Sequence, residues 1–384
     1  MASRSAGACI LCVVGARPNF MKIAPVIRAM QGANPPLPVR LVHTGQHYDP
    51  EMNSQYFDAL GIPDPDINLG VGSASHAVQT AEVMRRFEPV LDQEQPAAVL
   101  VVGDVNSTLA CALVAAKKGV AVIHVEAGLR SFDRGMPEEI NRVLTDQISD
   151  LLFITERDAR ANLLREGIAD SRIHFAGNVM IDTLRYNLAR AVPAVQTLGR
   201  HGAPAHWANN GFALLTMHRP SNVDEPATLR SVLGAIRDVS RKIPVAFAMH
   251  PRTRAKVEQH GLGGLLEDAS ILKLPPQGYL EMLGLMQAAR LVLTDSGGVQ
   301  EETTALGVPC ITLRDNTERP ITVEQGTNTL VGQNPARILA AVDETLGNAG
   351  KAGRIPELWD GRAAQRIAAV LRSWLDGAAE RKVA

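Results

Sequence analysis

Residues 98–128 read AVLVVGDVNSTLACALVAAKKGVAVIHVEAG, and the class of the fold can be inferred from these residues. They predict two strands, over 99–102 and 120–125, separated by a helix over 107–117. Neither apolar run alternates with polar residues, which is typical of strands buried on both faces in a parallel sheet that helices cover. A strand, a helix and a second strand in this order predict one repeat of a doubly wound α/β fold.

The same alternation extends in both directions along the chain. In the first half it predicts further strands over 10–14 and 40–44 and a helix over 77–91. The second half repeats the pattern, with strands expected over 212–217, 245–249, 271–274, 291–294 and 310–313 and helices over 228–241, 279–289 and 300–306. We therefore expect an α/β protein made of two Rossmann-like doubly wound domains.

The length of the chain also favours two domains. Its 384 residues exceed the roughly 250–300 at which one hydrophobic core stops growing. Residues 191–211 are rich in Pro, Gly, Ala and Asn and lack a regular period, which predicts the connection between the domains. The expected limits are 1–190 and 191–362, and an amphipathic helix over about 363–384 is expected to pack back on the first domain.

Composition and charge exclude several classes of protein. With 46% hydrophobic and 21% charged residues, the chain has the composition of a globular protein, which excludes disorder. Lys and Arg number 39 and Asp and Glu number 40, so no excess of positive charge predicts nucleic acid or an anionic membrane as a partner. No apolar stretch approaches the roughly 20 residues that cross a bilayer, so no membrane span is expected.

The cysteines predict a reducing cytoplasm. Cys9, Cys12, Cys111 and Cys310 lie in apolar runs and are too few and too scattered for a disulfide framework. Cys9 and Cys12 have CxxC spacing, but on a predicted strand residues three apart point to opposite faces. The run 8–14 is therefore interpreted as the first strand, and neither as a redox motif nor as the core of a signal peptide.

Polar residues gather directly after the predicted strands of the first half. Ligands of open α/β sheets bind outside the carboxyl ends of the strands, so these positions hold candidate site residues. Arg17 and Lys22 follow the first strand at the start of a helix, where two cations predict an anionic ligand such as a phosphate or a carboxylate. A solvated surface pair is the alternative. Gln46 and His47 follow the second strand.

Two carboxylates, Asp104 and Glu126, stand at equivalent points after successive strands. In a parallel sheet they can line one crevice, and paired carboxylates beside cations suit general acid and base catalysis. The alternative for either residue alone is capping of the following helix. Glu138 lies in the first turn of a predicted helix, where compensation of the helix dipole explains an acid, so it is a candidate only if that helix start faces the site.

The second half offers histidines and a glycine turn. His218 and His250 each follow a strand beside an arginine, where histidine can act as acid, base or donor to a phosphate, although a structural histidine is the commoner case. A strand, a turn at Ser296-Gly297-Gly298 and a helix follow one another, an arrangement in which backbone amides cradle phosphates. Glu302, one turn further, is placed to accept hydrogen bonds from ribose hydroxyls. A sharp turn alone would also explain the glycines.

Several cofactor motifs are absent from the sequence. It contains no G-x-G-x-x-G after its first strand, no G-x-x-x-x-G-K-[ST], no H-E-x-x-H and no Cys/His ligand cluster. We therefore expect no nicotinamide cofactor, no P-loop hydrolysis and no metal site.

Taken in order, the motifs at these strand ends resemble those of the non-hydrolysing UDP-N-acetylglucosamine 2-epimerases, over about residues 10–330. The motifs that carry the resemblance are Gly15-Ala16-Arg17-Pro18, Gln46-His47, Gly103-Asp104, His124-Val125-Glu126-Ala127-Gly128-Leu129-Arg130, Pro137-Glu138-Glu139-x-Asn141-Arg142, Thr216-x-His218-Arg219, Ser296-Gly297-Gly298-x-Gln300-Glu301-Glu302 and Arg314-Asp315-Asn316-Thr317-Glu318-Arg319-Pro320. An ordered set of this kind is far more specific than any one motif.

The resemblance implies a fold, a reaction and a set of roles. It implies a glycosyltransferase-B arrangement with an interdomain cleft, a homodimer, a UDP-sugar substrate and no cofactor. In the family, UDP is eliminated to give bound 2-acetamidoglucal and then adds back, which inverts carbon 2. The matching catalytic residues are Asp104, Glu126, Glu138, His218 and Lys22. The matching substrate-binding positions are Arg17, Gln46, His47, His250, Met282, Ser296, Gly297, Gly298, Glu302 and Arg319.

The sequence departs from typical bacterial members at Ala16, Asn19 and Ser221, and Met282 stands where an aromatic residue packs near the uracil. These departures bear on the identity of the substrate. A related branch of the family acts on diacetamido uronic acid sugars, which is one alternative. An inverting glycosyltransferase on the same scaffold is a second, and a nucleotide-sugar sensor without turnover is a third.

Overall fold

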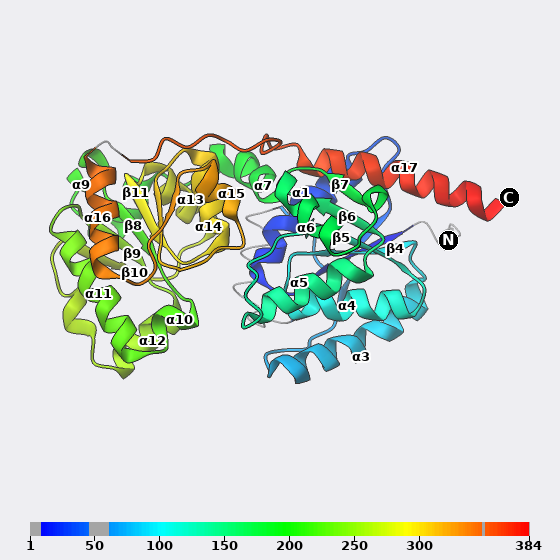
Figure 1. Cartoon of the computed structure of the whole chain (residues 1–384), viewed down its shortest axis with the longest axis horizontal. Helices are drawn as coiled ribbons and strands as arrows, with labels where there is room; N and C mark the ends of the chain where they lie inside the picture. The colour runs from blue at the N-terminus through cyan, green and yellow to red at the C-terminus, as the bar shows by residue number, and fades with distance from the viewer. Residues whose placement is uncertain (1–8, 46–60, 348–349, 384) are drawn as a thin grey trace. The chain divides into compact units, whose positions relative to one another are not determined.

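The computed structural model describes residues 9–45, 61–347 and 350–383. The chain divides into two compact units. Unit 1 comprises Met1–Tyr186 together with Glu357–Ala384, and unit 2 comprises Asn187–Pro356. Each unit is described by itself below, with the element labels of Figure 1.

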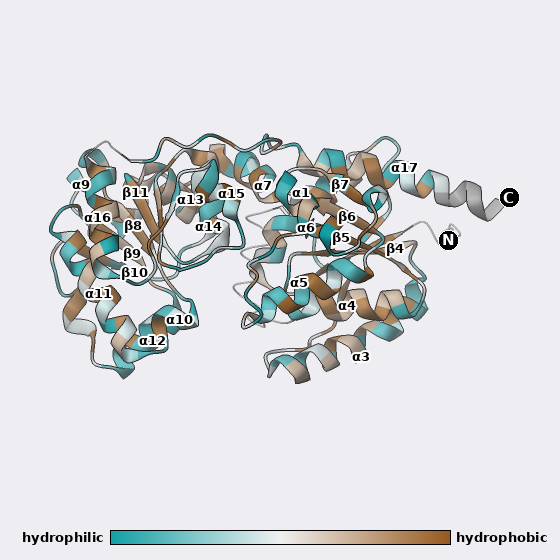
Figure 2. Ribbon diagram, in the orientation of Figure 1, coloured by the Kyte–Doolittle hydropathy of each residue, from teal (hydrophilic) through white to brown (hydrophobic). Residues whose placement is uncertain are grey.

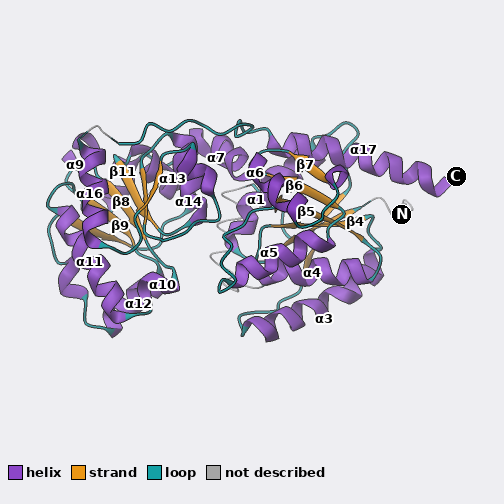
Figure 3. Cartoon of the chain, in the orientation of Figure 1, coloured by secondary structure: helices purple, strands orange, loops and turns teal. Residues whose placement is uncertain are grey.

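The described part of unit 1 holds a seven-stranded parallel sheet in the order β3-β2-β1-β4-β5-β6-β7. Its strands are β1 (Ile10–Val14), β2 (Val39–His43), β3 (Ile67–Asn68), β4 (Ala98–Val102), β5 (Ala121–Ala127), β6 (Leu151–Ile154) and β7 (Ile173–Phe175). The helices are α1 (Arg17–Gln31), α3 (His76–Glu94), α4 (Asn106–Lys117), α5 (Pro137–Ile148), α6 (Arg157–Arg165), α7 (Val179–Asn187) and α17 (Ala363–Val383), with a 3-10 turn η1 (Asp170–Arg172). Helices α3 and α4 lie on one face of the sheet, and α1 and α17 lie on the other (Figures 1 and 3).

Unit 2 repeats this plan with the order β10-β9-β8-β11-β12-β13. Its strands are β8 (Ala213–Thr216), β9 (Val245–Ala248), β10 (Ile271–Leu274), β11 (Leu291–Thr294), β12 (Cys310–Thr312) and β13 (Asn328–Leu330). Its helices are α8 (Ala194–Arg200), α9 (His206–Asn210), α10 (Pro220–Val223), α11 (Pro226–Ser240), α12 (Pro251–Gln259), α13 (Tyr279–Ala288), α14 (Gly297–Leu306), α15 (Pro320–Glu324) and α16 (Pro335–Leu346), with 3-10 turns η2 (Leu188–Arg190) and η3 (Gly263–Leu266).

The predicted α/β class with two Rossmann-like halves is confirmed by these two sheets. In each sheet the first strand of the unit lies in the middle, and the strand order reverses beside it. This switch point falls between β1 and β4 in unit 1 and between β8 and β11 in unit 2. Ligands of doubly wound proteins bind outside the carboxyl ends of the strands at such a point.

The cores lie between the sheets and the helices that cover them, and the strands are the most hydrophobic elements (Figure 2). In unit 1, for example, Val99 and Val101 of β4 belong to one buried cluster with Phe87 and Leu91 of α3. Each such side chain contributes about 1.5–3 kcal/mol on burial. Strands with both faces covered need no polar alternation, which is why they read as continuous apolar runs.

The segment 191–211 differs from its prediction as an irregular connection, because it contains helices α8 and α9. Two of its apolar residues are buried: Leu198 is 2% exposed and Trp207 is 3% exposed, whereas Val195 is 53% exposed. The backbone amide of Val192 donates to the carbonyl of Leu280 at 3.0 Å. Two short helices that each bury so few side chains leave too little periodicity to be recognised.

Helix α17 follows unit 2 in the sequence and packs against α1 in unit 1. Asp182 caps its start, because its carboxylate accepts from the amides of Ala363 at 3.1 Å and Ala364 at 2.7 Å. Burial raises the pKa of Asp182 to about 6. Trp359, fully buried just before the helix, donates from Nε1 to the carbonyl of Thr155 at 3.2 Å. Two separate segments of the chain thus build unit 1.

None of the helices within the described residues combines the length and the apolar character that a membrane crossing requires.

Candidate active site

The switch point of unit 1 brings the turn after β1 against the end of β4. Asn19 ties them together: its Oδ1 accepts from the amides of Gly15 at 3.2 Å and Ala16 at 3.1 Å, and its Nδ2 donates to the carbonyl of Val102 at 3.0 Å. A β-carbon on Gly15 would lie 2.3 Å from the hydroxyl oxygen of Ser107, so only glycine allows this close approach. The start of α1 is therefore held over the end of β4.

Lys22 of α1 and Glu126 of β5 form a buried ion pair at this point. The Nζ of Lys22 lies 2.6 Å from Oε1 of Glu126, and the two side chains are 7% and 1% exposed. Glu126 has φ of 73°, and the register between β5 and β6 shifts between Val125 and Ala127. A positive φ is strained for a glutamate, and bulges of this kind re-aim a side chain beside active sites. The local backbone thus turns a carboxylate toward a lysine.

Asp104, just after β4, is held by α5. Its carboxylate forms an ion pair with Arg142, and its carbonyl accepts from Nδ2 of Asn141 at 2.9 Å. The other side of Arg142 binds Oε2 of Glu139 at 2.6 Å. Glu139 is buried and also accepts from the amides of residues 131 and 132, so it has a structural role. Glu138, its half-buried neighbour, lies in the first turn of α5.

A buried network of hydrogen bonds and ion pairs holds the chain on either side of Asp104 and Glu126. His124 of β5 is fully buried, with Nδ1 at 2.7 Å from Asp146 and Nε2 at 2.8 Å from the carbonyl of Gly103. Asp146 also accepts from the amide of Gly128 at 3.0 Å and pairs with Arg130 at 2.7 Å. These bonds fix the two turns that precede and follow the site residues.

The switch point of unit 2 brings His218, after β8, next to Asp295, after β11. The strands are paired in parallel with Thr294 opposite Thr216, so both residues leave the same end of the sheet. Asp295 is fully buried and lies 3.1 Å from Nδ1 of His218. It also accepts from the amides of His218 and Arg219. Burial opposes ionisation, but the imidazole of His218 and these donors hold the pKa of Asp295 below its ordinary value.

His250 stands beside His218 at the start of α12. The two rings have centroids 5.2 Å apart. Nδ1 of His250 accepts from the amide of Arg252 at 3.1 Å, which caps the helix. The two histidines predicted in the second half, His218 and His250, therefore lie side by side, although one follows β8 and the other follows β9.

The start of α14 carries Ser296, Gly297 and Gly298 above a buried charge cluster. A β-carbon on Gly297 would lie 2.7 Å from Oε1 of Glu318 and 2.9 Å from Nη1 of Arg319, so only a glycine leaves room for these groups. Glu318 binds Arg314 at 2.8 Å and Arg319 at 2.7 Å. A helix start that is backed by guanidinium groups is suited to an anion.

Glu302 is buried one turn into α14. Its Oε1 accepts from the hydroxyl of Tyr279 at 2.9 Å. Burial and the neighbouring charge of Glu301 raise the pKa of Glu302 to about 7, against the effect of the tyrosine bond. Met282 lies half-buried on the same helix as Tyr279, α13.

Each unit thus gathers its own part of the predicted site. Lys22, Asp104 and Glu126 meet at the switch point of unit 1, with Glu138 nearby on α5. His218, His250, Ser296, Gly297, Gly298, Glu302 and Arg319 lie at the carboxyl ends of the strands of unit 2. Gln46 and His47 lie outside the described residues, and Arg17 begins α1 with a side chain outside them as well.

Comparison with known proteins identifies the family. The sequence model of UDP-N-acetylglucosamine 2-epimerase matches residues 29–372. The chain belongs to the UDP-N-acetylglucosamine 2-epimerase family. It is 43% identical to the UDP-N-acetylglucosamine 2-epimerase of Methanocaldococcus jannaschii, over 94% of this chain and 97% of that protein. It is 42% identical to the UDP-2,3-diacetamido-2,3-dideoxy-D-glucuronate 2-epimerase of Pseudomonas aeruginosa, over 88% of this chain and 92% of that protein.

The solved structures agree with the sequence relatives. The crystal structure of the Methanocaldococcus jannaschii UDP-GlcNAc 2-epimerase in complex with UDP-GlcNAc and UDP superposes with a TM-score of 0.85 at 42% identity, covering 95% of this chain and 99% of that one. The recognised resemblance to the 2-epimerases and the assignment to the glycosyltransferase-B fold class are therefore confirmed.

Sequence analysis missed several polar partners in this 2-epimerase. Arg142 binds Asp104, and Asp295 binds His218. Glu318 pairs with the arginines behind the start of α14. Each of Arg142, Asp295 and Glu318 lies within one of the motifs of the family resemblance or beside one. Their partners could not be chosen from the sequence, because most of these contacts join residues that different strands bring together.

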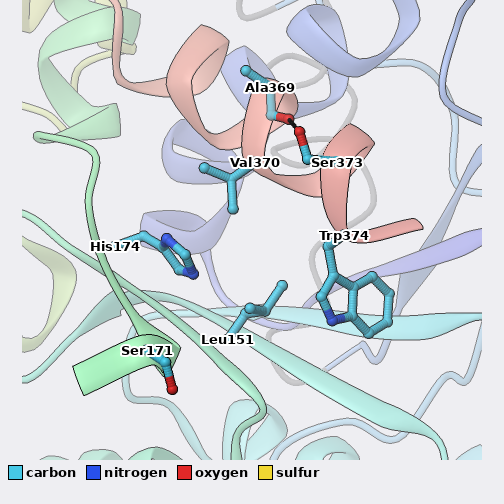
Figure 4. Close-up of a pocket in the computed structure, with 7 residues that line it drawn as sticks. All are labelled: Leu151, Ser171, His174, Ala369, Val370, Ser373 and Trp374. Carbon is cyan, nitrogen blue, oxygen red and sulfur yellow. Dashed lines mark hydrogen bonds between the residues drawn. The ribbon is translucent and has the colours of Figure 1, made fainter. Parts of the chain in front are cut away.

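The 2-epimerase has a separate pocket in unit 1 (Figure 4). It lies at the opposite end of the sheet from the candidate site residues. Leu151 begins β6, and with Ser171 and His174 it forms one wall, while Val370 and Trp374 of α17 form the other. The first residue of a parallel strand lies at the amino end of the sheet, opposite the end where ligands bind. We assign this pocket no part in the candidate active site.

Proposed function

We propose that this protein interconverts UDP-N-acetylglucosamine and UDP-N-acetylmannosamine. The observation that carries the proposal is the pair of carboxylates at the switch point of unit 1, each joined to a buried cation: Glu126 to Lys22 and Asp104 to Arg142. Two carboxylates at one end of a sheet can remove a proton and return it. The relatives that act on UDP-sugars support the same reading.

The proposed reaction is an elimination followed by an addition. A carboxylate takes the proton from carbon 2 while the bond from carbon 1 to the UDP oxygen breaks, which leaves 2-acetamidoglucal and UDP. A proton then reaches carbon 2 from the other face, and the UDP oxygen bonds to carbon 1 again. We assign the proton transfers to Asp104, Glu126 and Glu138, with His218 and Lys22 as further catalytic groups. Which carboxylate is the acid and which is the base stays open.

UDP needs stabilisation as a leaving group, and unit 2 offers it. Backbone amides at the start of α14 and the guanidinium of Arg319 are suited to the diphosphate, and Glu302 is suited to the ribose. The full set proposed to bind the substrate is Arg17, Gln46, His47, His250, Met282, Ser296, Gly297, Gly298, Glu302 and Arg319. No step of this reaction changes an oxidation state, so it calls for no redox cofactor.

A second candidate substrate is UDP-2,3-diacetamido-2,3-dideoxy-D-glucuronate. The Pseudomonas aeruginosa relative named for it is 42% identical to this chain, close to the 43% of the relative named for UDP-N-acetylglucosamine. The reaction at carbon 2 is the same for both sugars, so the catalytic assignments hold for either.

Proton NMR in deuterated water tests the function. The purified protein is mixed with UDP-N-acetylglucosamine and no cofactor, and carbon 2 and free UDP are followed. We expect the manno isomer to appear with deuterium at carbon 2. An unchanged spectrum, together with turnover of the diacetamido uronic acid sugar, would move the assignment to that substrate. Release of UDP only on addition of an acceptor would indicate a glycosyltransferase instead.

The raised pKa of Glu302 predicts a pH-dependent affinity. The charged carboxylate is the better acceptor for ribose hydroxyls, so binding should strengthen as the pH rises through about 7 and level off above it. Titration calorimetry with UDP-N-acetylglucosamine, from about pH 6 to about pH 8.5, measures this. Its diphosphate is esterified at both ends and adds no ionisation of its own in that range.

Two variants isolate the effect of Glu302. Glu302→Gln should bind more weakly at high pH and lose this pH dependence. Tyr279→Phe removes a bond that lowers the pKa of Glu302, so its binding transition should move to higher pH. Equal pH profiles for Glu302→Gln and the parent protein would contradict the assignment.

We also propose that the protein is a homodimer, as the family resemblance implies, and that it works in the reducing cytoplasm that its scattered cysteines predict. Light scattering should then give twice the 41.2 kDa of one chain.

A further inference from the structure

The carboxylate of Asp295 contacts the ring of His218. The neighbouring turn at Ser296-Gly297-Gly298 does not require this contact. One oxygen, Oδ1, lies 3.1 Å from Nδ1 of the His218 ring. The other, Oδ2, accepts from the amides of His218 at 2.9 Å and Arg219 at 2.8 Å and from Nδ2 of Asn222 at 2.9 Å. The amide of His218 also donates to Oδ1 at 3.1 Å. Oδ1 thus contacts both the ring and the backbone of His218, whereas Oδ2 binds two backbone amides and the side chain of Asn222.

The contact to the ring determines which nitrogen carries a proton. An ionised carboxylate only accepts hydrogen bonds, so Nδ1 must donate to it. In a neutral imidazole the other nitrogen, Nε2, then keeps its lone pair. Asp295 is fully buried, while the side chain of His218 is 37% exposed, so the fixed side of the ring faces the protein and the rest of the ring reaches its surface.

The surroundings of the pair support a built arrangement. Asp295 and His218 follow the two strands that flank the switch point of unit 2, where both chain segments leave the sheet. Nδ2 of Asn222 donates both to Asp295 and to the carbonyl of Leu313, at 2.9 and 3.0 Å, so the carboxylate is itself held in place. Because Asn222 is also bonded to Leu313, its bond to Asp295 restrains the rotation of the carboxylate. Partners of this kind orient functional side chains in proteins.

We propose that Asp295 is the positioning residue for His218: it fixes the ring in the Nδ1–H tautomer and directs Nε2 toward the substrate. The role in turnover rests on the proposed function, but the tautomer does not. In a proton-transfer step an imidazole in the opposite tautomer cannot accept a proton at Nε2. Loss of correctly placed acid–base catalysis costs roughly 10²- to 10⁴-fold in rate.

Asp295→Asn is a sharp test because the change is isosteric. The amide oxygen can take the place of Oδ2 and keep all three of its hydrogen bonds. The longer bond from the His218 amide to Oδ1 is lost, but the same amide keeps its bond to the oxygen in the place of Oδ2. The amide NH₂ then faces Nδ1 of His218 and donates to it, so the ring must carry its proton on Nε2 instead. We expect kcat to fall about 10²-fold or more while KM changes by less than about fivefold.

Nitrogen-15 NMR of ring-labelled protein reads the tautomer directly, with the His218 signals assigned by their loss in His218→Gln. The parent protein should show a protonated Nδ1, and Asp295→Asn should show a protonated Nε2. A parent ring with its proton on Nε2 would overturn the proposal even if Asp295→Asn does not fold. If the parent shows the expected tautomer but no epimerase activity, the proposed function fails and this inference stands.

Thr253→Val is the matched control. The Thr253 hydroxyl is buried and donates to the carbonyl of Met217, so its loss loosens the same loop without touching the ring contact. We expect the Nδ1–H tautomer and a kcat within about threefold of the parent. If Thr253→Val lost as much kcat as Asp295→Asn, or if Asp295→Asn kept the parent tautomer and rate, Asp295 would have only a structural role.

Discussion

Glu126→Gln is expected to lower kcat by about 10³-fold and to leave KM within about threefold of the parent value. The amide has the size of the carboxylate but can neither remove nor return the proton on carbon 2. It also leaves Lys22 without its charged partner at 2.6 Å. Initial rates from the NMR assay, with circular dichroism to check folding, measure the effect.

The same pair gives a test of whether its two members act as a unit. Lys22→Met should cost a similar factor, and the double variant should be little worse than either single one, because residues that act together are not additive. Glu82→Gln, which removes a half-buried carboxylate of α3 in the same unit, should keep the parent rate. Full activity in Glu126→Gln would remove this residue from the mechanism.

Glu318→Gln is expected to lower the free energy of unfolding of unit 2 by about 3–5 kcal/mol. Glu318 is 3% exposed and compensates the guanidinium groups of Arg314 and Arg319, with Arg219 at 3.6 Å. Without the charge of Glu318, Arg314 loses this carboxylate in a buried site, while Arg319 keeps Glu301 at 2.9 Å. Urea unfolding followed by Trp207 fluorescence reports on unit 2, once Trp359 and Trp374 of unit 1 are replaced by phenylalanine.

The pH dependence of this effect has a definite sign. Burial opposes the charge of Glu318, but Arg319, Arg314 and Arg219 together hold its pKa far below the ordinary value of 4.5. A lowered pKa means that the stabilisation is complete above about pH 4.5 and is lost as the pH falls below it. Glu318→Gln should therefore unfold with a shallower pH dependence in acid.

An exposed ion pair of the same unit provides the control. Asp343→Asn breaks the ion pair of Asp343 with Lys242, whose side chains are 56% and 37% exposed, respectively. This change should affect the free energy of unfolding very little. If Glu318→Gln were no less stable than Asp343→Asn, the buried cluster would not be held by Glu318.

Much of the fold could be predicted from the sequence because its strands are buried on both faces. The runs at 99–102 and 120–125 lie within one residue or two of the observed β4 and β5. Short edge strands escaped prediction for the opposite reason: β3 has two residues and β13 has three, too few for any pattern. Their place in the sheet depends on pairing with β2 and β12.

The positions of the site residues followed from strand ends, but their partners did not. His218 and Asp295 are 77 residues apart in sequence and meet because β8 pairs with β11 and not with β10. Strand order is a property of the whole sheet, and local patterns do not contain it. In the same way, of the adjacent acids at 138 and 139, only the helix geometry shows that Glu139 holds Arg142.

The two-part construction of unit 1 sets an order for folding during synthesis. Unit 2 is continuous in sequence, so it can be completed while α17 is still inside the ribosome. Unit 1 is translated first but lacks the side chains of Ile367 and Leu371, both buried at 0% exposure, until residues beyond unit 2 emerge. Of the two units, the one that is translated earlier is therefore the later to be completed, and until then the nascent chain leaves exposed to chaperones the apolar face of unit 1 that α17 later covers.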